Sequence, residues 1–215
     1  MEADTRLAAG PSAPTTAEGP RHGVGWADSL ARALANVLSP PVVTLGVLLL
    51  VASQTGAATA WRWAATFVVL GIVPPVFYVA WLVRRGHVTD IHLPLREERT
   101  RPFVATLASS GTALVVMAAL GAPPLLVVVA AAGWLQVALL FAITLRWKIS
   151  THCAAAAALA ALAVGLRGTP AVPLVAIVPV VAWSRLRLQR HDRAQVVAGG
   201  VLGAGVTLVL WKLLA

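Results

Sequence analysis

Seven long apolar runs separated by short polar loops dominate this sequence. They cover residues 42–55, 61–83, 103–121, 123–146, 150–166, 171–184 and 194–214. A helix needs about 20 apolar residues to cross the hydrocarbon core of a bilayer, a length that the second, third, fourth and seventh runs reach. The first run is long enough only if an amphipathic helix expected over residues 26–38 continues into it. The sequence therefore predicts an all-α, polytopic membrane helical bundle with six or seven transmembrane helices.

The composition separates a short tail from this membrane domain. Charged residues make up 12% of the chain, whereas a soluble domain carries about 25%. The single cysteine, Cys153, excludes a disulfide scaffold. Residues 1–24 are rich in Ala, Pro, Thr, Ser and Gly and lack apolar periodicity, which predicts a disordered N-terminal tail. Residues 25–215 form the predicted transmembrane domain.

The net charge is +9, and most of the basic residues lie in the short stretches between apolar runs. This distribution favours the bilayer surface and an anionic membrane lipid as partners, and it argues against nucleic acid. We expect a multi-pass protein of the cell membrane. Nothing in the sequence specifies an oligomeric state.

Three polar loops, at residues 84–102, 146–152 and 184–193, are expected to share one face of the bundle. Two apolar runs separate each loop from the next, and an even number of crossings returns the chain to the same side. These loops hold Arg84, Arg85, Arg96, Arg99, Arg101, Arg146, Lys148, Arg185, Arg187, Arg190 and Arg193. Because basic residues gather in cytoplasmic loops, this face is expected to be cytoplasmic. The same face also holds His87, His92, His152 and His191, which the charge rule does not explain.

The three loops carry short motifs of polar residues. The first ends Arg96-Glu-Glu-Arg99-Thr-Arg101-Pro102, the second reads Trp147-Lys148-Ile149-Ser150-Thr151-His152, and the third reads Ser184-Arg185-Leu-Arg-Leu-Gln-Arg-His191-Asp-Arg-Ala-Gln195. Together, over about residues 84–205, they resemble the type 2 phosphatidic acid phosphatase superfamily. Its motifs run Lys-x6-Arg-Pro, Pro-Ser-Gly-His and Ser-Arg-x5-His-x3-Asp. The resemblance implies a membrane lipid phosphatase that works without metal or other cofactor.

The resemblance also implies roles for individual side chains. His191 matches the nucleophile that forms a phosphohistidine, and His152 matches the acid that protonates the leaving alkoxide. The phosphate would be held by Arg101, Arg185, Lys148 and Ser150, with Arg96, Arg99 or Lys148 in place of the family lysine. Arginine suits this task because its planar fork of donors matches phosphate oxygens.

Gln195 stands where the family has an aspartate. It follows His191 by four residues, one helical turn, so the two side chains are expected to meet. The amide oxygen would accept the ring N–H of His191 and fix its tautomer. Asp192 is expected to point about 100° away from His191, as neighbours on a helix do, and so not to replace the missing carboxylate.

A Gly-x-x-x-Gly pair, Gly199 and Gly203, lies in the last apolar run. Two small residues at this spacing let the backbones of two helices approach closely. We therefore expect the last helix to pack tightly against a neighbour through this face.

Several alternatives remain open. The same histidines would serve a lipid phosphotransferase, in which an alcohol replaces water, and the cations alone would serve a non-catalytic lipid-phosphate-binding protein. His87, Asp90 and His92 have the ligand types of a divalent metal site, and Asp90 with Glu97 and Glu98 could chelate magnesium. Cys153 is a possible thiol nucleophile, although a lone cysteine more often packs. The substrate class is open between glycerophospholipid phosphates and polyprenyl mono- or diphosphates.

Overall fold

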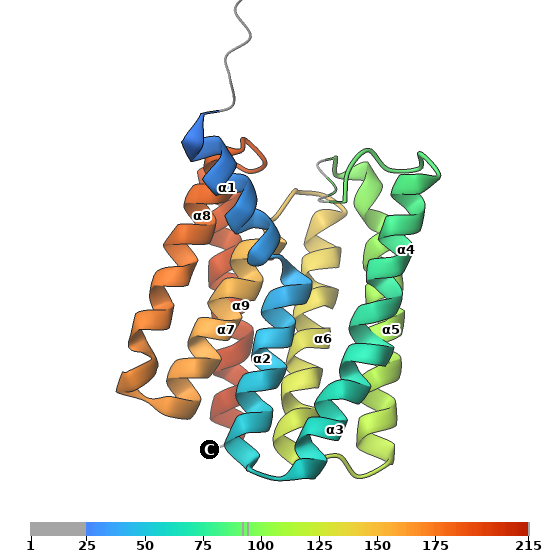
Figure 1. The fold of residues 1–215 in the computed structure, drawn as a ribbon, viewed down its shortest axis with the longest axis vertical. Coiled ribbons are helices and arrows are strands. Elements are labelled where there is room, and N and C mark those ends of the chain that lie inside the picture. Colours follow the sequence, from blue (N-terminus) through green and yellow to red (C-terminus); the bar gives the residue numbers. More distant parts are fainter. Residues whose placement is uncertain (1–24, 92, 94, 215) are drawn as a thin grey trace, which may run out of the picture.

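The computed structural model describes residues 25–91, 93 and 95–214, so the tail predicted over residues 1–24 lies outside the described part. Its elements are α1 (Trp26–Val37), α2 (Pro40–Thr55), α3 (Ala58–Phe67), η1 (Val68–Ile72), α4 (Val73–Arg84), η2 (Glu97–Arg99), α5 (Thr100–Ala119), α6 (Pro124–Thr144), α7 (Thr151–Arg167), η3 (Thr169–Ala176), α8 (Ile177–Arg187) and α9 (Arg193–Leu214). Every regular element of the described residues is helical, and the helices form one bundle (Figure 1). The predicted all-α membrane bundle is confirmed.

The number of full-length spans is lower than predicted. Five helical segments of the described residues are long and apolar enough to cross a membrane: Ala58–Arg84, Glu97–Ala119, Pro124–Thr144, Thr169–Arg187 and Arg193–Lys212. A sixth results if α1 and α2, which meet at an angle of 52°, form one broken span. The apolar helix α7 has only 17 residues, about 25 Å at 1.5 Å per residue. The described chain therefore has five or six full-length spans where six or seven were predicted, and α7, which corresponds to the run predicted over residues 150–166, is the one that is short.

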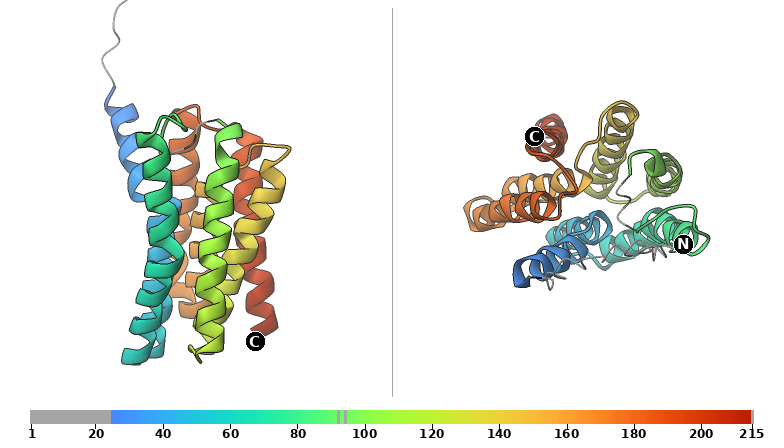
Figure 2. Two further views of the ribbon diagram at one scale, coloured as in Figure 1. Left: turned by 90° about the vertical axis from the view of Figure 1, so that its right-hand side faces the viewer. Right: turned by 90° about the horizontal axis from the view of Figure 1, so that it is seen from above.

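The short helix α7 lies in the middle of the bundle. It packs against α2, α8 and α9, and the view from above shows it between α2 and α9 (Figure 2). Nine of its residues are buried, and most of these are alanines. Because protein covers so much of its surface, α7 does not need to match the thickness of the bilayer.

The helix α9 packs against α7 through its glycines. A Cβ atom at Gly199 would overlap the backbone carbonyl of Ser150, and one at Gly203 would overlap that of Ala154. Both glycines therefore lie in backbone-to-backbone contact with α7, as the Gly-x-x-x-Gly spacing predicts. At Gly200, in contrast, an added Cβ meets nothing within 4 Å.

The three motif-bearing loops lie together. The connections from α4 to α5, from α6 to α7 and from α8 to α9 are all at the same end of the bundle, the upper end in Figure 1. This end is called the loop face below. The arrangement that an even number of crossings predicts is confirmed.

Gly203→Ala should destabilise the protein, and Gly200→Ala should not. The methyl group at position 203 would force α9 away from α7, and overpacking of this kind costs about 1–3 kcal/mol. At position 200 the methyl group enters open space, and alanine is the better helix former. Thermal unfolding of the two variants in detergent micelles measures the difference. Equal midpoints would contradict the close contact between α7 and α9.

Candidate functional site

The helices α5, α7 and α9 begin at the loop face. A helix N-terminus presents unpaired N–H groups and partial positive charge, which favour an anion. Ser150 caps α7, since its Oγ accepts a hydrogen bond from Cys153 N at 3.3 Å, and Asp192 caps α9, since its Oδ1 accepts one from Gln195 N at 2.8 Å. Ser150 N also donates to Gln195 O at 3.3 Å. The starts of α7 and α9, which carry the second and third motifs, are therefore joined directly.

A tight turn after α8 positions His191. Gln189 adopts a left-handed conformation with φ of 52°. Its N–H donates to Leu186 O, and Arg190 N donates to Arg185 O, both at 3.0 Å. These two bonds form a Schellman motif, a common way to end a helix. The chain then reverses within a few residues, so that His191 stands directly before α9.

The imidazole of His191 is buried and held from one side. Its Nδ1 lies 2.8 Å from Gln195 Oε1, the contact expected from the spacing of four residues. Gln195 Nε2 in turn donates to Asp192 Oδ2 at 2.9 Å. As expected, Asp192 does not take the place of a carboxylate on the ring, because Gln195 Oε1 occupies that position at Nδ1. The carboxylate instead reaches the ring through Gln195.

Two arginines are buried at the loop face. Arg99, 4% exposed, ends η2 and donates to the backbone carbonyls of Leu93 at 3.0 Å and Ile149 at 3.2 Å. Arg185, 1% exposed, lies near the end of α8, and no described residue accepts a hydrogen bond from its Nε. A buried guanidinium is costly unless its charge is balanced. Asp90 supplies an opposite charge near Arg185, and the two arginines are together a candidate binding site for an anion.

Two acidic side chains of the first loop, Asp90 and Glu98, make hydrogen bonds near these arginines. Asp90 Oδ2 accepts from Arg190 Nη2 at 3.0 Å. Glu98 accepts from the backbone N of Thr89 at 2.9 Å and from its Oγ1 at 3.1 Å. The contact between Asp90 and Arg190 links the first loop to the third, and the contacts between Glu98 and Thr89 stabilise the first loop itself. Asp90 also acts electrostatically on Arg185, so it balances part of the positive charge of the site.

Electrostatic coupling joins the residues of the site. The pKa of His191 is lowered to about 3, mainly by burial and also by the charges of Arg99, Arg185 and Lys148, although the hydrogen bond with Gln195 opposes these effects. Burial also lowers the pKa of Lys148, as do Arg99 and Arg185. Arg99, Lys148, Arg185 and His191, which come from three separate loops, therefore form one group, called the cationic cluster below. At neutral pH the imidazole within it is uncharged.

The other predicted site residues lie in different environments. His152 is buried, 6% exposed, in the first turn of α7, and Ser150 is fully buried as its cap. Arg101 is exposed to solvent. Arg96 donates to the backbone carbonyls that follow α6, at Leu145 and Arg146, with distances of 3.2 and 2.9 Å. Of the first-loop arginines, only Arg99 therefore belongs to the cationic cluster.

The residues considered for a metal do not converge. No group of three or more His, Cys, Asp or Glu side chains that could hold a metal ion is found within the described part of the chain. His87 is exposed beside the ring of Trp81, and His92 lies outside the described residues. Cys153, the possible thiol nucleophile, is fully buried in the packing of α7.

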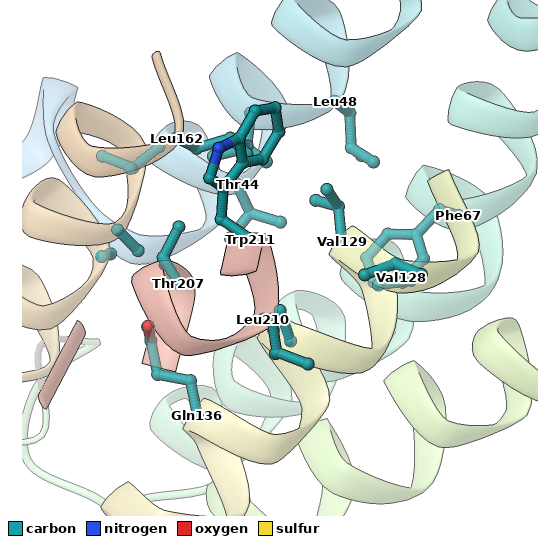
Figure 3. Close-up of a pocket in the computed structure, with 17 residues that line it drawn as sticks. Thr44, Leu48, Phe67, Val128, Val129, Gln136, Leu162, Thr207, Leu210 and Trp211 are labelled. Atoms are coloured by element: carbon teal, nitrogen blue, oxygen red, sulfur yellow. The ribbon is translucent and has the colours of Figure 1, made fainter. Parts of the chain in front are cut away.

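An apolar cavity of about 100 Å³ lies within the bundle, lined mainly by α2, α6, α7 and α9 (Figure 3). Gln136 lies at one end of it and Trp211 toward the other. On α7 the lining begins at Ala155, which follows His152 by three residues. Side chains at this spacing are neighbours on a helix surface, so the cavity starts about one helical turn below His152.

No protein-family model, curated protein or solved structure matches this chain. The three loop motifs therefore remain a resemblance, and the chemistry of the loop face follows from its own side chains.

His191 should remain neutral at about pH 5, where an ordinary histidine is mostly protonated. With its pKa lowered from 6.5 to about 3, the unfolded chain takes up a proton in this range that the folded chain does not. The free energy of unfolding should therefore fall as the pH drops from 6.5 toward 3. Nitrogen NMR shifts of the ring, assigned with His191→Gln, measure its protonation. A ring that titrates near pH 6.5 would contradict its burial among cations.

Proposed function

We propose that this chain is a membrane phosphatase that hydrolyses a lipid phosphate through a phosphohistidine at His191, without a metal ion. The observation that supports it most is a pair of buried guanidinium groups, Arg99 and Arg185, beside a neutral imidazole. The imidazole is the nucleophilic form of histidine. The guanidinium groups stabilise the charge on a phosphoryl group as it transfers. Both are needed at one place, and the cationic cluster supplies both.

The reaction has two steps. In the first, the Nε2 lone pair of His191 attacks phosphorus, the bond from phosphorus to the lipid oxygen breaks, and protonated His152 gives its proton to that oxygen. In the second, water attacks phosphorus and the bond from phosphorus to Nε2 breaks. His152 takes a proton from the water, and inorganic phosphate leaves. One imidazole thus serves as nucleophile and the other as acid and then base.

The lipid character of the substrate follows from the surroundings of the site. The cationic cluster lies at the loop face of an apolar bundle, where the phosphate of a membrane lipid is found. The cavity that begins near His152 is apolar and takes part of the hydrocarbon chain. We place the loop face on the cytoplasmic side of the cell membrane, because most of the basic loop residues lie there.

Purified protein in detergent should release phosphate from at least one member of a panel of glycerophospholipid and polyprenyl phosphates, with or without a chelator. His191→Ala should reduce release to background, because the nucleophile is lost. The matched control is His87→Ala, which removes an exposed histidine of the same face and should keep full activity.

Three other outcomes would replace this proposal. Loss of activity with the chelator or in His87→Ala would favour a metal site around His87. Transfer of the phosphoryl group to an added alcohol, faster than to water, would make the protein a phosphotransferase. Lipid phosphate that binds without turnover on any substrate would make it a binding protein.

Arg185→Ala should weaken both turnover and anion binding. Removing one preorganised donor from a phosphoryl or oxyanion site costs about 10²–10³ in rate. Vanadate, a phosphate mimic, should raise the unfolding temperature of the wild type and not of this variant.

Arg187→Ala is the matched control, two residues away on α8. Arg187 is half-exposed and pairs with Asp28 at 2.7 Å, and an exposed pair contributes at most about 1 kcal/mol. Equal loss of vanadate stabilisation in both variants would show a general charge effect and no specific site.

A further inference from the structure

We propose that Asp192 sets the tautomer of His191 through the side-chain amide of Gln195. The inference rests on the proposed function of His191 as nucleophile, and it makes Asp192 a positioning residue that touches neither substrate nor the reacting atoms. Its basis is the continuous chain of hydrogen bonds from Asp192 Oδ2 to Gln195 Nε2, 2.9 Å, and from Gln195 Oε1 to His191 Nδ1, 2.8 Å.

The direction of this chain follows from donor and acceptor chemistry. A carboxylate accepts hydrogen bonds and cannot donate them, so the NH₂ group of Gln195 must face Asp192. The amide oxygen then faces His191, and because that oxygen only accepts, the proton of the neutral ring must lie on Nδ1. Nε2 is left with its lone pair. The carboxylate of Asp192 thus selects the nucleophilic nitrogen of His191 through the intervening side chain of Gln195.

The two oxygens of Asp192 have different partners. Oδ1 caps α9 by accepting from Gln195 N at 2.8 Å, and Oδ2 accepts from the side chain of the same residue. The cap alone would orient neither Gln195 nor the ring. This division allows the capping role and the positioning role to be separated by mutation.

No other charged group in the cationic cluster can take over the positioning role. The charges that act on His191 come from Arg99 on η2, Lys148 in the loop before α7 and Arg185 on α8. All three side chains are donors without acceptor capacity. They can face the lone pair of Nε2 or the phosphate, but they cannot hold the proton of Nδ1.

Asp192→Asn separates the two roles. Asparagine caps a helix as well as aspartate does, so the introduced oxygen keeps the bond from Gln195 N. Its NH₂ group then replaces Oδ2, and the Gln195 amide must turn to present its oxygen there. The amide NH₂ group now faces His191 Nδ1, which becomes an acceptor, and the ring proton moves to Nε2. The nucleophilic lone pair is lost.

The measurement is the nitrogen NMR shift of the His191 ring at about pH 8, above the usual histidine pKa, in the full chain in detergent micelles. Wild type should show the proton on Nδ1, and Asp192→Asn should show it on Nε2 with an unchanged unfolding temperature. Phosphate release should fall at least about 100-fold, since a wrong tautomer costs a catalytic histidine up to about 10⁴ in rate.

The double variant Asp192→Asn with Gln195→Glu is the decisive control. It exchanges the carboxylate and the amide and keeps the net charge. The introduced glutamate accepts both from the introduced asparagine and from His191 Nδ1. The proton should return to Nδ1, and most of the lost activity should return with it. A purely structural role for Asp192 predicts no such rescue.

We call the chain of hydrogen bonds from Asp192 through Gln195 to His191 the relay. The proposal is contradicted if Asp192→Asn keeps the proton on Nδ1, or if the folded double variant leaves it on Nε2. Because the NMR signal needs no turnover, this failure differs from failure of the proposed function. If the proton lies on Nδ1 in the wild type and on Nε2 in Asp192→Asn, but the wild type hydrolyses no lipid phosphate, the relay is supported and the proposed phosphatase activity is excluded.

Discussion

The contact between α7 and α9 determines the geometry of the whole loop face. Gly199 and Gly203 allow the two backbones to touch near the ends that carry Ser150 and Gln195. The hydrogen bond from Ser150 N to Gln195 O then fixes the register between the two helix starts. His152 lies two residues beyond Ser150, and His191 precedes Gln195 by one turn. Any side chain larger than glycine at this contact would separate the second motif from the third.

The second constraint is the concentration of positive charge that this contact produces. Three helix N-termini and the buried cations Arg99 and Arg185 meet at the loop face, where few carboxylates compensate them. Asp90 partly relieves the repulsion through Arg190, and Asp192 opposes the lowering of the Lys148 pKa. Such an arrangement is costly in the folded protein alone and becomes favourable when an anion binds. The proposed anionic substrate would offset part of this electrostatic cost.

The sequence allowed the bundle, the shared loop face and the glycine contact to be predicted, because each follows from a local pattern. Apolar runs and an even number of crossings need no knowledge of tertiary packing. To tell which of Arg96, Arg99 and Arg101 belongs to the cationic cluster, the tertiary packing was needed. These residues lie within six positions of one another, and only the path of η2 and its hydrogen bonds show that Arg99 is buried. The hydrogen bond between the side chains of Gln195 and Asp192 was not predicted, because Asp192 caps α9 and its side chain turns back toward the first turn of that helix.

The relay through Gln195 also explains how the cationic cluster and a neutral nucleophile can coexist. A carboxylate directly on Nδ1 would favour the imidazolium form and would cancel part of the positive charge near the phosphate. A neutral amide in that position orients the ring without adding negative charge, while the surrounding cations disfavour protonation of His191. Asp192 supplies the orientation from one residue further away, where its charge acts less on the ring. In the proposed mechanism, an amide backed by a carboxylate would therefore orient the histidine nucleophile and leave more positive potential for an anionic substrate than a carboxylate placed directly on Nδ1.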